Sequence, residues 1–208
     1  MLVTKFVHSC LLIEEDGKRL LIDPGNYTTE AGVLNISSQE ALDYLLITHE
    51  HADHMDLTLI KKVTEKFPYL KILSNNSVAS LLDKEGIKVS VESDQMVKME
   101  LVPHEKVFGS IPPENIMMTV AGKLAHPGDS HHFQTKAPIL ALPIQAPWGS
   151  LTEAVELAER LKPQAILPIH DWHWNDKARE MLYKRLEDYF GKIGIKFVPL
   201  KTGEMVEF

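Results

Sequence analysis

Leu46-Ile47-Thr48-His49-Glu50-His51-Ala52-Asp53-His54-Met55-Asp56 places four side chains of the metal-ligand type within six residues. They follow an apolar run over residues 44–47, whose aliphatic and β-branched side chains predict a buried strand. The four side chains are therefore expected in a loop just past the end of a strand. Neutral imidazole nitrogen and carboxylate oxygen are ligands that zinc and similar divalent ions prefer.

The spacing of these four side chains favours two ions over one. Reaching a single tetrahedral ion with all four would strain the backbone severely. Two adjacent ions divide them more naturally, with His49 and His51 on one, and Asp53 and His54 on the other. The alternative is a solvated, His-rich loop. That interpretation is weaker, because His and Asp are costly to hold close together unless something neutralises or orders them.

The stretch resembles the H-x-H-x-D-H signature of the metallo-β-lactamase-fold hydrolases, in which it opens a dinuclear site. That family also has a further His, an Asp in a Gly-Asp pair and a last His after a C-terminal strand. This chain offers His104, Asp129 in His126-Pro127-Gly128-Asp129-Ser130, and His170 in the same order. The resemblance implies an α/β fold, a four-layer αββα sandwich that forms one domain over residues 1–208.

The resemblance also assigns seven ligands to two divalent ions, with zinc expected first and manganese or iron as alternatives. The implied ligands are His49, His51 and His104 for the first ion, Asp53, His54 and His170 for the second, and Asp129 as the bridge. Two such ions can share a hydroxide at neutral pH and polarise a carbonyl or phosphoryl oxygen. The implied reaction is hydrolysis.

Other polar and aromatic residues near these motifs have less certain roles. Asp53 could also orient the attacking water, and His126, next to the Gly-Asp pair, is a candidate catalytic residue. Asp23 is either a turn former or a partner that orients a ligand imidazole. His131 is expected to be a plain loop residue. The roles of a further group stay open between substrate contact and core packing: His132, Trp148, Trp172, His173 and Trp174.

Composition limits the class of protein. The 208 residues suit one domain, and 44% of them are apolar. A net charge of −7 argues against a nucleic-acid surface. Cys10, the single cysteine, excludes an internal disulfide and is expected to be buried. With no evident signal peptide and no apolar run approaching ~18 residues, a cytoplasmic enzyme that does not bind membranes is expected, and homo-oligomer formation is left open.

The remaining pattern alternates strands with amphipathic helices, and each expected ligand follows a predicted strand. Strands are predicted at residues 2–7, 10–15 and 18–23, with a hairpin turn at Asp16-Gly17. Residues 26–38 are predicted to form an irregular, flexible loop beside the site, and residues 87–91 a further strand. A capping box at Ser150 and Glu153 predicts a helix start.

Among relatives of the fold, the chain most resembles compact single-domain hydrolases, including ascorbate-6-phosphate-lactonase-like members. The features behind this resemblance are His8-Ser9-Cys10, Asp23-Pro24, residues 126–130 and Pro168-Ile169-His170. An ester, lactone or phosphodiester bond of a small molecule is the expected target. The alternatives are a non-catalytic metal-binding or sensing module and a phosphodiesterase acting on nucleic acid.

Overall fold

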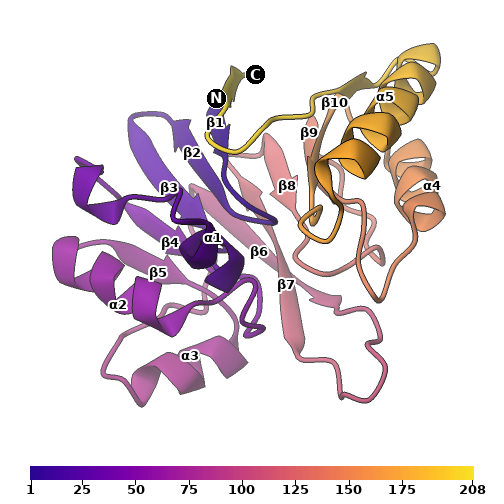
Figure 1. Ribbon diagram of the computed structural model, residues 1–208. Helices are drawn as coiled ribbons and strands as arrows, with labels where there is room; N and C mark the ends of the chain where they lie inside the picture. The colour runs from indigo at the N-terminus through magenta and orange to yellow at the C-terminus, as the bar shows by residue number, and fades with distance from the viewer.

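The computed structural model describes residues 1–208 and contains two six-stranded sheets packed face to face, with helices on both outer faces (Figure 1). This is the αββα sandwich that the sequence predicts. The two chain ends meet at one side of the molecule, where the Met1 amino group donates a hydrogen bond to the Phe208 carbonyl at 3.0 Å.

The first sheet combines the N-terminal strands with the last strand of the chain. In spatial order it contains β12 (Met205–Glu207), β1 (Leu2–Lys5), β2 (Leu11–Glu15), β3 (Lys18–Ile22), β4 (Tyr44–Leu46) and β5 (Lys71–Leu73). Strands β12 to β3 pair antiparallel, and β3, β4 and β5 run parallel. Its outer side carries α1 (Asn26–Ala31), α2 (Leu57–Lys66) and α3 (Asn76–Asp83), with a 3₁₀ turn, η1 (Ile36–Ser38).

The second sheet has the same division into antiparallel and parallel parts. In spatial order it contains β11 (Lys196–Phe197), β10 (Ala165–Ile169), β9 (Ile139–Pro143), β8 (Leu124–His126), β7 (Glu114–Val120) and β6 (Val97–Pro103). Strands β6, β7 and β8 are antiparallel, and β8 to β11 are parallel. The helices α4 (Leu151–Leu161) and α5 (Asp176–Lys192) cover its outer face.

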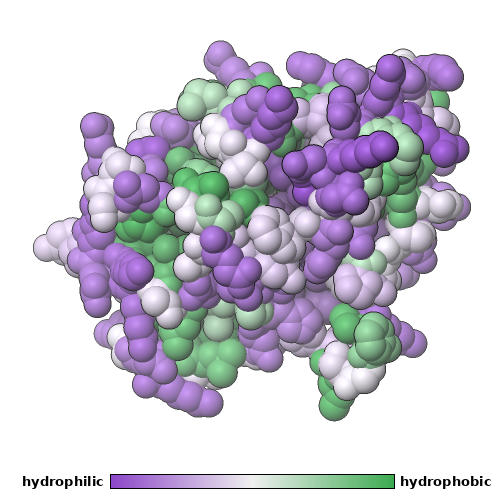
Figure 2. Space-filling model, viewed as in Figure 1, coloured by the Kyte–Doolittle hydropathy of each residue, from purple (hydrophilic) through white to green (hydrophobic).

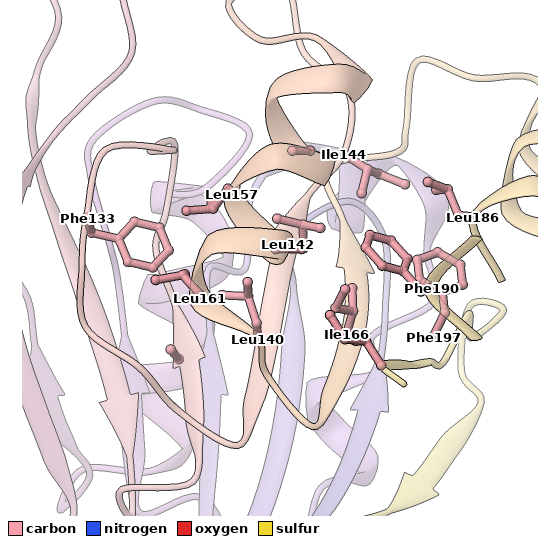
Figure 3. Packing of buried hydrophobic residues seen from close by; sticks show 14 of the residues in the cluster. Phe133, Leu140, Leu142, Ile144, Leu157, Leu161, Ile166, Leu186, Phe190 and Phe197 are labelled. Atoms are coloured by element: carbon pink, nitrogen blue, oxygen red, sulfur yellow. The ribbon is translucent and has the colours of Figure 1, made fainter. Parts of the chain in front are cut away.

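Strand alternation divides the apolar side chains into three layers. On β2, Leu11 and Ile13 face the other sheet, whereas Leu12 faces the helices. Between the sheets lies one buried cluster, and each sheet forms another with its own helices. Figure 3 shows the cluster beneath α4 and α5, where Phe190 and Phe197 stack 5.8 Å apart between ring centroids.

Several local predictions are confirmed. Asp16 and Gly17 both have positive φ (48° and 70°), as a tight hairpin turn requires. The capping box at Ser150 and Glu153 begins α4. Cys10 is fully buried among apolar residues beside the first sheet. None of the helices has the length and apolar character needed to cross a membrane, and Figure 2 shows many hydrophilic residues on the visible face.

Two predicted segments differ from the structure. Residues 26–38 form α1 and η1 rather than an irregular loop, because Gly25 and Gly32 bound a short helix and the Asn35 side chain caps the 3₁₀ turn. The mostly polar sequence gives no helical pattern of apolar residues, because Thr28 is the only buried residue of α1. Residues 87–91 make a single bridge, from Ser90 to Leu73, instead of a strand.

A buried ion pair joins the first sheet to the loop and helix that follow β10. Lys5 Nζ donates to both carboxylate oxygens of Asp171 at 3.1 and 3.2 Å, and Tyr183 and Arg179 of α5 contact the same carboxylate. Burial alone would raise the pKa of Asp171, but Lys5 and its neighbours outweigh burial and lower it. The stabilisation is therefore present above an unfolded aspartate's pKa of about 3.9 and is lost as pH falls through the lower folded value.

Replacing Lys5 with Met should destabilise the protein by up to about 3–5 kcal/mol, because it removes the buried cation of Asp171 and leaves only the partly exposed Arg179 beside that charge. Urea unfolding at neutral pH measures the change. The matched control is Lys61→Met, which breaks the ion pair between Lys61 and Glu85. These two side chains are 46% and 36% exposed, so the control substitution should change stability little. Equal, small effects of the two substitutions would contradict a structural role for the buried pair.

Candidate metal centre

The site lies at one edge of the sandwich, where strands of both sheets end. His49 follows β4, His104 follows β6, Asp129 follows β8 and His170 follows β10. Strands that run in parallel bring their carboxyl ends to the same edge of a sheet, so loops from distant parts of the chain meet there. This arrangement unites all seven ligands that the sequence predicts.

The ligand-type side chains form two groups, and within each group the facing atoms all lie within 4.8 Å of one another. We call them the first group and the second group. The first group contains His49, His51, His104 and Asp129. The second contains His8, Asp53, His54 and His170. Apart from His8, this is the division expected from the sequence.

Asp129 stands between the two groups and turns one carboxylate oxygen to each. Its Oδ1 lies 3.0 Å from His54 Nε2 and 3.2 Å from His170 Nε2. Its Oδ2 lies 3.6 Å from His104 Nε2 and 3.9 Å from His49 Nε2. A carboxylate placed in this way can bridge two ions, as the family resemblance implies for this residue.

Hydrogen bonds to the far side of each ring fix which nitrogen faces the centre. His54 Nδ1 donates to Asp23 Oδ2 at 2.7 Å, and His104 Nδ1 donates to the Glu105 carbonyl at 2.6 Å. His170 Nδ1 donates to the Gln145 carbonyl, also at 2.6 Å. These bonds direct the Nδ1 proton of each of these three rings away from the centre, so that Nε2 is the nitrogen that can bind a metal. Asp23 therefore orients an imidazole, which resolves the two roles left open for it.

Unpartnered buried atoms at the centre fit two metal ions. Nε2 of His49, His54 and His170 and Oδ1 of Asp129 are buried and accept or donate no hydrogen bond. Leaving four such atoms unsatisfied in one place is costly, and a cation that accepts their lone pairs removes that cost. The donors are imidazole nitrogens and carboxylate oxygens, a set suited to zinc and similar divalent ions.

Electrostatics of the ion-free centre differ between the two groups. Burial and the nearby His54 lower the pKa of His49. Burial would lower the pKa of His54 too, but Asp129, Asp23 and Asp53 outweigh it and raise that pKa. For Asp129, His170 and His54 overcome burial and lower the carboxyl pKa well below its usual value. In the ion-free centre His54 therefore holds a proton more strongly than His49.

Two glycines let backbone segments approach closely around the ligands. A Cβ on Gly25 would lie 1.8 Å from the Asp53 carbonyl oxygen, so only glycine fits against the ligand loop. Gly128 has φ 58°, and a Cβ there would lie 2.2 Å from Asn115 Oδ1. The backbone thus passes close to Asn115 just before Asp129.

His126 does not face the centre, so its predicted catalytic role needs correction. The ring is fully buried, with Nε2 donating to the Ser9 carbonyl at 3.0 Å and Nδ1 accepting from the Gly128 amide at 3.3 Å. Both nitrogens are thus engaged with backbone, and neither is free for a substrate. His126 joins β8 to the turn after β1 and supports the Gly128-Asp129 segment.

The two neighbouring histidines also lie outside the ligand groups. His131 was expected to be a plain loop residue, but it is buried and its Nε2 donates to the Pro143 carbonyl at 2.9 Å. The side chain of His132 is 71% exposed and pairs with Glu105. Neither residue touches the proposed ligands through an observed hydrogen bond.

His8 is the site residue that the sequence reasoning missed. It is buried, has φ 62°, and its Nε2 lies 3.1 Å from Asp53 Oδ2. Its carbonyl accepts a hydrogen bond from the His170 amide at 3.2 Å. Burial and then His170 lower the pKa of His8 to about 3, so the ring is neutral. Its position just after a strand, like that of the other ligands, is the signal that could have identified it.

Aromatic side chains surround the centre in two different ways. Tyr27 and Trp172 stack beside His8 with ring centroids 5.2 Å apart, and the Tyr27 hydroxyl lies 3.3 Å from His173 Nε2. These half-buried or exposed rings border the second group. Trp174 instead packs against Tyr183 and belongs to the core beneath α5. Core packing is therefore confirmed for Trp174, whereas Trp172 and His173 lie beside the second group.

Comparison with known proteins identifies the family and supports the fold. A family model described as "Beta-lactamase superfamily domain" matches residues 2–170. Protein Rv0786c from Mycobacterium tuberculosis is 32% identical over 202 residues, which cover 90% of this chain and 92% of that protein. A UPF0173 metal-dependent hydrolase from Carboxydothermus hydrogenoformans is 27% identical, with 99% of each chain covered.

A solved structure agrees with the architecture. The metallo-β-lactamase fold protein YhfI from Bacillus subtilis superposes with a TM-score of 0.71 at 16% identity, over 100% of this chain and 98% of that one. At this identity the similarity concerns the fold alone. Taken with the family model and the sequence relatives, it shows that the chain belongs to the metallo-β-lactamase superfamily and, within it, to the UPF0173 metal-dependent hydrolases.

Proposed function

We propose that the protein hydrolyses an ester, lactone or phosphodiester bond of a small molecule with two divalent ions, zinc in the first instance. The observation that supports this most directly is the placement of Asp129, with one oxygen toward each group of ligands. When bound, such ions supply polarisation of a carbonyl or phosphoryl oxygen and a water molecule of lowered pKa.

The ligands of this chain would divide as the geometry places them. His49, His51 and His104 would hold one ion, and Asp53, His54 and His170 the other, with Asp129 shared. Asp53 is the accessible member of the second group, with 23% of its side chain exposed. Its carboxylate can therefore accept a hydrogen bond from a water molecule at the mouth of the site and orient that water toward a substrate.

The surroundings of the second group favour a small substrate with an apolar or ring-shaped part. Tyr27 and Trp172 present stacked aromatic rings next to His8, within reach of a molecule bound at Asp53. A lactone, as in the ascorbate-6-phosphate-lactonase-like relatives that the sequence resembles, fits this description. A nucleic acid is a less suitable substrate, because the net charge of −7 repels its phosphates.

Metal analysis followed by a substrate panel tests the proposal. Purified protein loaded with zinc should hold two ions per chain and turn over at least one member of a panel of lactones, aryl esters and phosphodiesters. Asp129→Ala should lose metal and activity together, because it removes a ligand from both ions. Two bound ions without turnover of any substrate would favour a sensing module, and one ion or none would contradict the dinuclear site.

His8→Asn should weaken binding of the second-group ion by roughly 10–100-fold, because Asp53 loses the partner that holds its carboxylate. Competition with a chelator measures the affinity of each ion. His132→Asn is the matched control, since that imidazole is exposed and outside both groups, and it should leave both affinities unchanged. Unchanged binding in His8→Asn would show that Asp53 needs no such partner.

Acid should release the second-group ion before the first-group ion. His54 has a raised pKa in the ion-free protein, so protons compete for its Nε2 at a higher pH than they do at His49, whose pKa is lowered. Protein equilibrated at successive pH values from 8 down to 5 and freed of unbound metal should pass through a state with one ion per chain. Simultaneous loss of both ions, or earlier loss of the first-group ion, would contradict this order.

A further inference from the structure

One hydrogen bond at the centre comes from a residue that the proposed function does not use. Trp148 Nε1 donates to Asp129 Oδ2 at 2.8 Å. It is the only hydrogen bond that the structure gives to the side chain of Asp129, whose Oδ1 has none. The orientation of the bridging carboxylate therefore depends on an indole N–H.

The chain holds this indole in place with a short turn after β9. Ala146 and Gly149 pair across residues 147 and 148, and Ser150 then caps α4. Gly149 packs against the ring of His131, because a Cβ at that position would lie 3.2 Å from His131 Cε1. That ring, bonded to the Pro143 carbonyl, lies 5.3 Å from the Trp148 ring. His131 thus acts as a buried support for the turn.

The indole also spans the two groups of ligands. Its centroid lies 6.4 Å from the ring of His104 in the first group and 5.2 Å from the ring of His170 in the second. Trp148 is half-buried, so one part of it faces the ligands and another faces solvent. Trp148 thus lies against one ring of each group as well as the shared carboxylate.

We propose that Trp148 is a positioning residue for the bridging carboxylate of Asp129. Its N–H occupies one lone pair of Oδ2 and so limits rotation of the carboxylate. Oδ1 is kept toward the second group, and the remaining lone pair of Oδ2 is kept for the first group. Without this bond the carboxylate could turn both oxygens to one ion and leave the other short of a ligand. The inference rests on the proposed function only in taking Asp129 to bind two ions.

Trp148→Phe tests the proposal, because it keeps an aromatic ring and removes only the N–H donor. Trp148→Ala removes both, and Trp172→Phe is the matched control, a half-buried tryptophan that makes no hydrogen bond to Asp129. Chelator competition gives the affinity for each of two zinc ions, and the visible absorption of cobalt-loaded protein reports ligand geometry. Melting temperatures of the ion-free variants show whether the fold is intact.

We expect Trp148→Phe and Trp148→Ala to weaken binding of the first-group ion by about 10–100-fold, to the same extent in both variants. Binding of the second-group ion should be less affected. The cobalt spectrum should change in both variants and stay unchanged in Trp172→Phe. Wild-type affinity and spectrum in Trp148→Phe, with losses only in Trp148→Ala, would overturn the inference and leave packing as the role of the ring. Fewer than two ions in the wild type would overturn the proposed function itself.

Discussion

The carboxylate of Asp129 is the group on which the rest of the site depends. It is buried, and its Oδ1 lies 3.0 Å from His54 Nε2 and 3.2 Å from His170 Nε2. A negative charge in that position needs positive charge on both sides. Metal ions in the two groups would provide it, and so the two sheets must bring their strand ends to the same edge. The αββα arrangement satisfies this requirement.

Around that carboxylate, most ligands have a partner that sets their orientation. Asp23 holds His54, main-chain carbonyls hold His104 and His170, and His8 holds Asp53. Asp23, Gln145 and His8 lie on loops that are distant in sequence from the ligands they hold. The apolar layers therefore contribute to the chemistry indirectly, because they fix the separation of the backbone segments that carry these partners.

The sequence predicts the fold and the ligands well where the signal is local. Asp53 and His54 come from a single short stretch, and the resemblance to the family's ordered set of ligands points to His104 and His170. The missed features depend on tertiary contacts. Nothing near His8 in the sequence reveals that it meets Asp53, and His126 resembles a catalytic residue until both of its nitrogens are found bonded to backbone. Likewise, the sequence does not predict α1, because the fold buries only one of its side chains and the helix therefore has no apolar face.

The division of ligands between the two halves of the chain has a consequence for biosynthesis. The first group is completed by His104 and Asp129, and the second by His170, yet the stretch that holds His49 to His54 leaves the ribosome earlier than any of these. A nascent chain that ends before β10 already contains the first group but lacks His170, so the second group is incomplete until β10 and the residue after it have been made. Binding of ions by both groups would therefore have to wait until the last parallel strands of the second sheet have been translated and have docked.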